Sequence, residues 1–91
     1  MYELHTSSKF NKDYERMRKR GYDLTKLRQV VNDLVEGRPL QEKHRDHALT
    51  GRYVGMRECH IEPDWLLVYE IDGEKITLVL IRTGTHSDLF R

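Results

Sequence analysis

Cysteine is nearly absent from this chain, since Cys59 is the only one among 91 residues. A single cysteine excludes an internal disulfide framework and is typical of a reducing compartment, so we expect a cytoplasmic protein. No run of apolar residues approaches the roughly 18 needed to cross a membrane. The first residues also lack a basic segment followed by an apolar one, which argues against a signal peptide.

The composition that remains is polar but typical of a globular protein. Charged residues make up 34% and hydrophobic residues 37% of the chain. A chain of this length buries about 65% of its surface on folding, which is enough for a core without metal or disulfide support. We therefore expect residues 1–91 to form one domain.

Basic and acidic side chains are unevenly distributed, although the net charge is only +1. Residues 1–58 carry 13 Lys and Arg against 9 Asp and Glu, whereas residues 59–91 carry 3 against 6. The densest basic segment, residues 9–28, holds 8 basic and 3 acidic side chains. Such a segment is either a solvated helix face or a surface that binds a polyanion, and charge alone does not separate the two.

The first half of the chain predicts a strand followed by two helices. Residues 2–6 alternate apolar and polar side chains, as in a strand. Ser7 or Ser8 can cap a helix that ends near Gly21, and Asp23 can cap a second helix that Gly37 and Pro39 end. The expected buried positions of the two helices are Phe10, Tyr14 and Met17, then Leu24, Leu27, Val30, Val31 and Leu34. Because the connection is short, we expect an antiparallel helix hairpin.

The second half predicts a loop and then three antiparallel strands. Residues 38–51 are rich in charge and histidine, as loops often are. Strands are expected near 53–58, at 65–71, where both faces are apolar, and at 76–81, with a tight Asp72-Gly73 hairpin between the last two. Residues 83–85 break the last strand, and 87–90 form a tail of about one helical turn. Helices and strands are segregated, so the fold class is α+β, in the order βααβββ.

Histidine is the most unusual constituent, with five in the chain. His44, His47, His60 and His86 lie in loops or near strand ends, where the strands of a meander bring them together. Imidazole titrates near neutral pH and is the natural proton carrier. A zinc site built from these histidines and Cys59 is the first competing interpretation, but their spacing matches no zinc motif. We therefore predict neither a metal nor a cofactor.

Two further clusters could act with the histidines. Arg82 ends the last strand beside His86, and arginine offers a permanent charge and a planar fork of donors that matches phosphate oxygens. A positive clamp beside proton-transfer groups suits cleavage of an RNA phosphodiester. Asp64 could orient a histidine, act as a base or only form a turn. Trp65 could stack a nucleobase or belong to the core.

These residues resemble the YafQ branch of the RelE/ParE toxin superfamily. The resemblance lies in residues 45–51, 53–60, 61–69 and 82–90, and its specific parts are HIEPDW at 60–65 and RTGTH at 82–86. It implies the toxin of a bacterial type II toxin–antitoxin system, a ribosome-dependent mRNA interferase that cleaves messenger RNA in the ribosomal A site. It also implies a cognate antitoxin as partner, with the ribosome and mRNA, and no membrane.

Matched residue by residue, the resemblance assigns the catalytic residues His47, His60, Asp64, Arg82 and His86. It assigns Trp65 and Phe90 to substrate binding, and Phe90 has no other support in the sequence. The roles we expect are His86 as general acid, His47 or His60 as general base, and Arg82 as the group that stabilises the phosphorane. Asp64 is the other candidate base or an orienting group. Such a mechanism needs no metal and leaves a 2′,3′-cyclic phosphate.

Two other interpretations of the function remain open at this point. ParE-type relatives share the fold but bind DNA gyrase without nuclease chemistry, and this is the alternative function. The chain could also be an inert relative that serves only as the partner of a regulator. Several titratable groups around an arginine have little use in a pure binding protein, which favours the nuclease.

Overall fold

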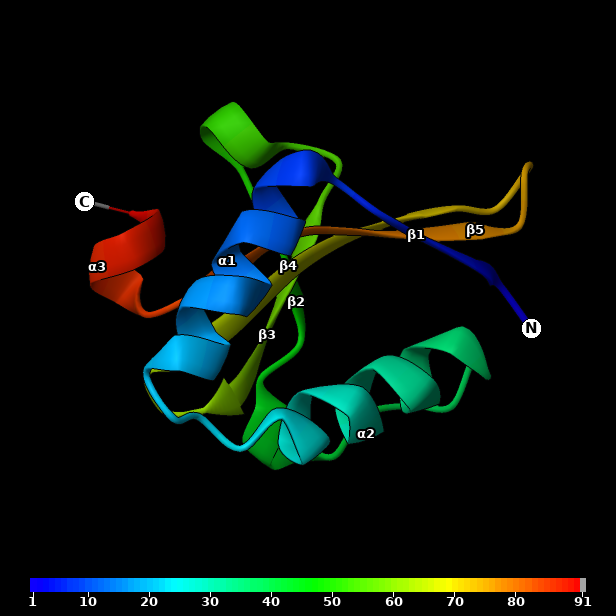
Figure 1. Cartoon of the computed structure of the whole chain (residues 1–91). Coiled ribbons are helices and arrows are strands. Elements are labelled where there is room, and N and C mark those ends of the chain that lie inside the picture. Colours follow the sequence, from blue (N-terminus) through cyan, green and yellow to red (C-terminus); the bar gives the residue numbers. More distant parts are fainter. Residues whose placement is uncertain (91) are drawn as a thin grey trace.

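A mixed sheet of five strands forms the centre of the structure, a computed structural model that describes residues 1–90 (Figure 1). The elements are β1 (Glu3–Thr6), α1 (Ser8–Lys19), α2 (Leu24–Val35), η1 (Glu42–His44), β2 (His47–Ala48), η2 (Gly51–Tyr53), β3 (Arg57–Glu62), β4 (Trp65–Asp72), β5 (Thr77–Gly84) and α3 (His86–Leu89). The strand order is β1-β5-β4-β3-β2, in which β1 runs parallel to β5 and the other neighbours are antiparallel. The α+β class and the element order are confirmed, with short β2 added inside the predicted loop.

Both long helices begin at the predicted caps. The Ser7 hydroxyl accepts a hydrogen bond from the Phe10 amide at 2.9 Å, and the Asp23 carboxylate accepts one from the Thr25 amide at 3.1 Å. These bonds satisfy amides that the first turn of a helix leaves without partners. Ser7 also donates to the Ile81 carbonyl at 2.7 Å, which fixes the start of α1 against β5.

The expected antiparallel hairpin of helices is wrong in its packing. Figure 1 shows that α1 passes the end of β5 at a steep angle to the strands, whereas α2 points in another direction and extends roughly along the strands below the sheet. The main contacts of α1 are with β5, and α2 packs against β3. A short connection is compatible with an antiparallel pair of helices. Here, however, the apolar face of each helix packs against a different part of the sheet.

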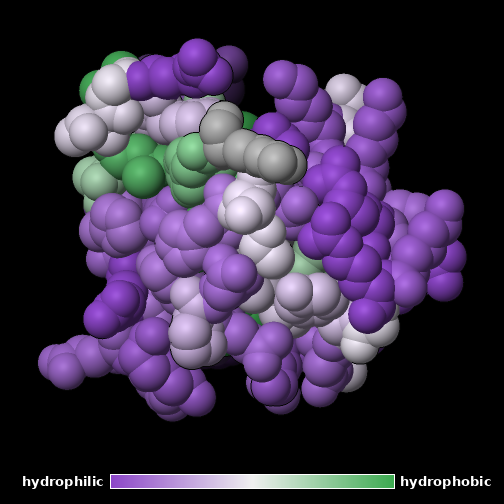
Figure 2. Space-filling model, turned by 90° about the vertical axis from the view of Figure 1, so that its left-hand side faces the viewer, coloured by the Kyte–Doolittle hydropathy of each residue, from purple (hydrophilic) through white to green (hydrophobic). Residues whose placement is uncertain are grey.

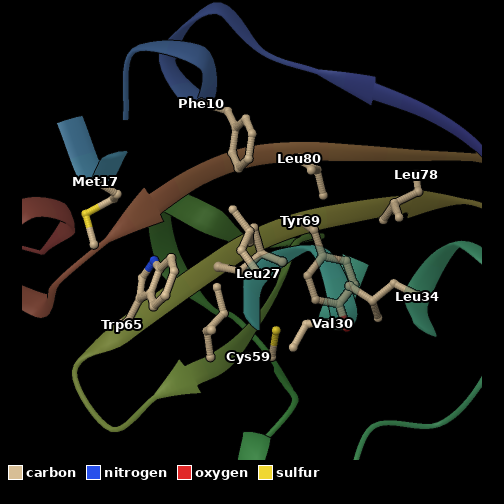
Figure 3. Packing of buried hydrophobic residues seen from close by; sticks show 12 residues of the cluster. Phe10, Met17, Leu27, Val30, Leu34, Cys59, Trp65, Tyr69, Leu78 and Leu80 are labelled. Atoms are coloured by element: carbon tan, nitrogen blue, oxygen red, sulfur yellow. The ribbon is translucent and has the colours of Figure 1, made fainter. Parts of the chain in front are cut away.

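The core lies mainly between the sheet and the two long helices. Figure 3 shows helix residues such as Leu27 and Val30 facing strand residues such as Tyr69 and Cys59. A smaller cluster on the opposite face of the sheet contains Leu66, Val68 and Leu89 with Leu49, Met56 and Ile81 packed against it. Residues 65–69 are therefore buried on both faces, as predicted.

Several strand boundaries differ from the predictions. Strand β3 starts at Arg57 rather than near 53, because Gly51 and Gly55 adopt positive φ angles of 64° and 91° and turn the chain there. The β4–β5 connection is longer than a two-residue hairpin, and the Asp72 carboxylate accepts hydrogen bonds from two amides within it. Strand β5 continues to Gly84, with a bulge at its Ile81. Within residues 1–90, no helix combines the length and apolar character that crossing a membrane requires.

Candidate active site

Three histidines meet on the sheet face opposite the long helices. His60 of β3 pairs with Leu66, and His47 of β2 pairs with Glu58, so their side chains share the face of the smaller apolar cluster. The ring centroids of His60 and His86 are 5.7 Å apart, and those of His47 and His60 are 6.4 Å apart. The structure thus brings His47, His60 and His86 together within reach of one small substrate group.

His86 is oriented by Asp64. One carboxylate oxygen of Asp64 accepts hydrogen bonds from His86 Nδ1 at 2.5 Å and from the His86 amide at 2.9 Å. The amide and imidazole of His86 lower the pKa of Asp64 below its ordinary value, so the carboxyl stays ionised. With Nδ1 committed to a carboxylate, Nε2 of His86 is the nitrogen left for proton transfer. Among the roles left open for Asp64, the geometry favours orientation of His86.

His47 and His60 have their ring orientation fixed by backbone carbonyls. His47 Nδ1 donates to the Arg45 carbonyl at 2.7 Å, and His60 Nδ1 lies 3.3 Å from the Pro63 carbonyl. Because a carbonyl oxygen only accepts, the proton of each neutral ring belongs on Nδ1. Nε2 is therefore the reactive nitrogen of both rings.

Arg82 is held by a buried aspartate that the sequence did not point to. Arg82 Nε and Nη2 donate to the Asp13 carboxylate at 2.6 and 3.1 Å, and Asp13 in α1 is 1% exposed. This contact raises the pKa of the Arg82 guanidinium above its ordinary value. The fork that we expected to grip a phosphate is thus occupied by Asp13. The remaining nitrogen, Nη1, has no hydrogen-bond partner within residues 1–90 and is the one available to an anion.

The expectation that Trp65 stacks a nucleobase is wrong for this structure. Trp65 is fully buried, and its ring meets Tyr22 edge to face with centroids 5.0 Å apart. Its indole Nε1 donates to the Thr83 hydroxyl at 3.0 Å, and the Thr83 amide donates to Asp13 at 3.2 Å. Trp65 therefore belongs to the core and supports the segment that carries Arg82.

Phe90 lies at the exposed edge of the site. It is 44% exposed and meets Tyr53 edge to face, with ring centroids 5.7 Å apart. The two rings border a pocket of about 390 Å³ that Leu49, Thr50, Arg52 and Leu89 also line. Figure 2 views the side of the molecule on which α3 lies in Figure 1, and hydrophobic surface is confined there to a small area. Phe90 is placed where a base could pack against it.

The short helix α3, which begins at His86, is held by a capping box at its start and by an ion pair with Arg20. Thr85 and Asp88 form a capping box, in which the Thr85 hydroxyl accepts from the Asp88 amide and the Asp88 carboxylate accepts from the Thr85 amide. Arg20, just after α1, donates two bonds to Asp88 at 2.8 and 3.1 Å. A side chain at Gly84 would place its Cβ 2.9 Å from Asp88 Cβ, so this close approach requires glycine.

The variant Asp88→Asn is expected to lower the melting temperature at pH 7, because Arg20 loses its charged partner. Arg20 holds the pKa of Asp88 well below its ordinary value. A carboxyl whose pKa is lowered by folding adds stability above its unfolded-state pKa of about 3.9 and loses it as the pH falls further. Melting curves should therefore show a difference from the wild type that is largest near neutral pH and shrinks towards pH 2.

Asp33→Asn is the control for this experiment, since Asp33 also pairs with an arginine, Arg38, but far from the site. Exposed pairs of this kind contribute little to stability. If the effect of Asp88→Asn is the same at pH 7 and pH 2, the contact with Arg20 acts through shape and not through charge.

Two residues considered from the sequence lie outside the site. His44 donates from Nδ1 to the His60 carbonyl at 2.7 Å and lines a different pocket, next to α2. Cys59 is buried in the helix-side core, where loss of solvation raises the pKa of its thiol to about 12. Within residues 1–90, no three His, Cys, Asp or Glu side chains are placed to hold a metal ion.

Sequence reasoning missed Asp13, Glu58 and Tyr53. Asp13 and Arg82 are 69 positions apart in the chain, and no local sequence pattern predicts a contact between them. Glu58 did carry a signal, because it stands two residues before His60 on one strand and so shares its face. Tyr53 belongs to a short 3-10 turn that the sequence presented as the start of a strand.

Comparison with known proteins identifies the family. A family model described as the bacterial toxin of a type II toxin–antitoxin system, YafQ, matches residues 2–91. The chain belongs to the YafQ toxin family. The mRNA interferase toxin YafQ of Escherichia coli K12 is 35% identical over 89 residues, which cover 97% of this chain and 95% of the relative. The resemblance read from the sequence is confirmed.

Solved structures of YafQ-family and related toxins have the same fold. A metal-bound toxin from Helicobacter pylori is 47% identical with a TM-score of 0.93, over 99% of this chain and 100% of that one. The toxin in the DinJ–YafQ complex of Escherichia coli is 35% identical with a TM-score of 0.92, over all of both chains. The sheet and helices that position the site are therefore those of the YafQ family.

Proposed function

We propose that this YafQ-family toxin is an mRNA interferase, which cleaves messenger RNA on the ribosome by metal-independent acid–base catalysis and so inhibits translation. The observation that carries the proposal is the meeting of His47, His60 and His86 beside Arg82 on one face of the sheet. The naming of the curated relatives as mRNA interferases favours this function over binding of DNA gyrase.

Each group has a role in transfer of the phosphodiester. His47 or His60 accepts the proton of the 2′-hydroxyl on Nε2, and the 2′-oxygen then attacks phosphorus. His86, held by Asp64, donates the proton on Nε2 to the departing 5′-oxygen. The guanidinium of Arg82 stabilises the negative charge of the phosphorane through Nη1. The products are a 2′,3′-cyclic phosphate and a 5′-hydroxyl.

The partners follow from the same proposal. A toxin that acts on translating ribosomes works in the cytoplasm and requires a cognate antitoxin. The Escherichia coli relative has been crystallised with DinJ. We expect a neutralising partner to present acidic and apolar groups, covering either the basic helices or the histidine site. A toxin–antitoxin complex that still binds ribosomes would exclude the first of these routes.

The proposal is tested with purified toxin, ribosomes and a synthetic message. Because a related toxin has been crystallised with metal, the protein is treated with a chelator and freed of it by dialysis before assay. We expect cleavage at the untreated rate and a 2′,3′-cyclic phosphate on the upstream fragment. A 3′-hydroxyl end, or activity that returns only when zinc or copper is added, would contradict the proposed chemistry.

The basic segment 9–28 is proposed to bind ribosomal RNA. All eight of its basic side chains are exposed. Four of them form ion pairs with carboxylates: Arg16, Arg18, Arg20 and Lys26. Lys9 and Lys12 form none within residues 1–90, so they can be changed without breaking an ion pair of the described structure.

Replacing both Lys9 and Lys12 by glutamate should weaken ribosome binding, because phosphate contacts release counterions and repulsion replaces them. Affinity of the wild type should fall steeply as salt rises, and that of the variant less steeply. The matched control reverses Lys43 and Lys75, which lie outside the segment. Equal affinity of wild type and variant, or a shallow salt dependence of the wild type, would contradict the proposal. Lys9 and Lys12 would then belong to a solvated helix face that does not bind RNA.

A further inference from the structure

We propose that Glu58 is a positioning residue of this site, which holds His47 and His60 and stabilises the imidazolium that forms when one of them takes the proton of the 2′-hydroxyl. This inference rests on the proposed nuclease function. Glu58 Oε1 lies 3.4 Å from His47 Nε2 and 3.6 Å from His60 Nε2. One carboxylate therefore faces the reactive nitrogens of two histidines.

Burial makes this carboxylate effective. The side chain of Glu58 is 8% exposed, and that of His60 is 10% exposed. Opposite charges interact more strongly there than in water, because less solvent screens them. Glu58 pairs with Val68 of β4, and Leu66 and Glu70 flank Val68 on the same face, so Glu70 is the one charged side chain of β4 near it. The other titratable groups that face it are His47 from β2 and His60 from its own strand, with the His86–Asp64 pair beyond His60 and Arg82 of β5 beyond Val68.

The hydrogen bonds of the two rings give the carboxylate its role. Both Nδ1 atoms face carbonyl oxygens, so each neutral ring presents an unprotonated Nε2 to Glu58. A lone pair beside a carboxylate is unfavourable, whereas a protonated Nε2 beside it is stabilised. Glu58 thus makes Nε2 a stronger proton acceptor.

The proton count of the reaction is unchanged by this role. The 2′-hydroxyl proton moves to Nε2 of His47 or His60, the bond from the 2′-oxygen to phosphorus forms, and the bond to the 5′-oxygen breaks. His86 supplies the proton for the 5′-oxygen. Glu58 exchanges no atom with the substrate and acts through the histidines, in the way that a carboxylate orients a catalytic histidine and stabilises its charged form.

The test is the pH dependence of cleavage by Glu58→Gln, measured with an excess of toxin over ribosome-bound message. We expect the maximal rate to fall about tenfold or more, because the base is weakened. We also expect the acidic limb of the rate profile to move to lower pH by about one pH unit, because the base loses a facing negative charge. Glu58→Asp keeps the carboxylate, so its acidic limb should stay at the wild-type position.

The control is Glu74→Gln, which removes a carboxyl from the connection between β4 and β5, away from the histidines, and it should behave as the wild type. A Glu58→Gln variant that cleaves as the wild type, or one whose rate falls with no movement of the limb, would overturn the inference. If the wild type itself cuts no message, the result contradicts the proposed nuclease function. It is thereby distinguished from a failure of the role of Glu58, in which the wild type cuts and Glu58→Gln cuts equally well.

A second measurement uses the unmodified protein and does not depend on folding of the variants. Nitrogen chemical shifts of ¹⁵N-labelled histidines distinguish the two neutral tautomers. We expect neutral His47 and His60 to carry their proton on Nδ1. A proton on Nε2 of both neutral rings would overturn the inference, because each ring would then donate to Glu58 and could accept nothing on that nitrogen.

Discussion

Replacement of His86 by alanine is expected to slow cleavage of ribosome-bound message by about 10² to 10⁴-fold, the usual contribution of a positioned proton-transfer group. The fold should survive, because the side chain of His86 is 55% exposed and holds little of the core. The variant loses the imidazole that Asp64 holds and that we propose as the general acid. Single-turnover rates on translating ribosomes, with melting curves on the same samples, measure both effects.

His5→Ala is the matched control for this variant. His5 is a half-exposed histidine in β1 that pairs only with nearby Glu3 in the described structure. It should cleave as the wild type does. If folded His86→Ala also cleaves at the wild-type rate, His86 is not the general acid.

Replacement of Arg82 by alanine is expected to cost about 2–4 kcal/mol of transition-state stabilisation, by analogy with removal of an oxyanion-hole donor. The Nη1 atom of Arg82 would no longer meet the phosphorane charge. Asp13 would also be left buried beside the site with a single arginine, Arg16, at 3.2 Å. We therefore expect some loss of stability in addition to the loss of rate.

Arg82→Lys separates the two contributions. Lysine keeps the charge, but it cannot donate from two nitrogens to Asp13 and from a third to the substrate. Its rate should lie between those of the wild type and Arg82→Ala. Arg38→Ala, which changes an arginine just beyond the C-terminal end of α2, is the control. If Arg82→Ala inhibits growth as the wild type does at an equal protein level, Arg82 only holds Asp13 and has no part in the reaction.

The fold was predictable where local patterns decide it. The caps at Ser7 and Asp23, the helical spacing of Leu27, Val30 and Leu34, and the apolar run of β4 each follow from the nearest residues in the chain. Helix packing was not predictable in this way, since a short connection fits either a hairpin or two diverging helices. The bulge in β5 also depends on the neighbouring strand and not on residues 77–84 alone.

The site was predictable as a set of residue types more than as a geometry. The histidines and the RTGTH segment pointed to proton transfer beside a positive charge, and the structure brings His47, His60 and His86 together. The partners of these groups come from distant positions. Asp13 reaches Arg82 from α1, and core packing decides that Trp65 is buried. Such contacts appear only when the chain is folded.

Mapping of message ends by primer extension, in cells that translate a defined transcript while the toxin is induced, is the decisive test of the proposed cleavage of messenger RNA. We expect discrete cuts within codons of the translated region, none in a message whose start codon has been removed, and none when His86→Ala is induced at the same level. Growth arrest with an intact message, or cuts that the His86→Ala variant makes equally well, would contradict it.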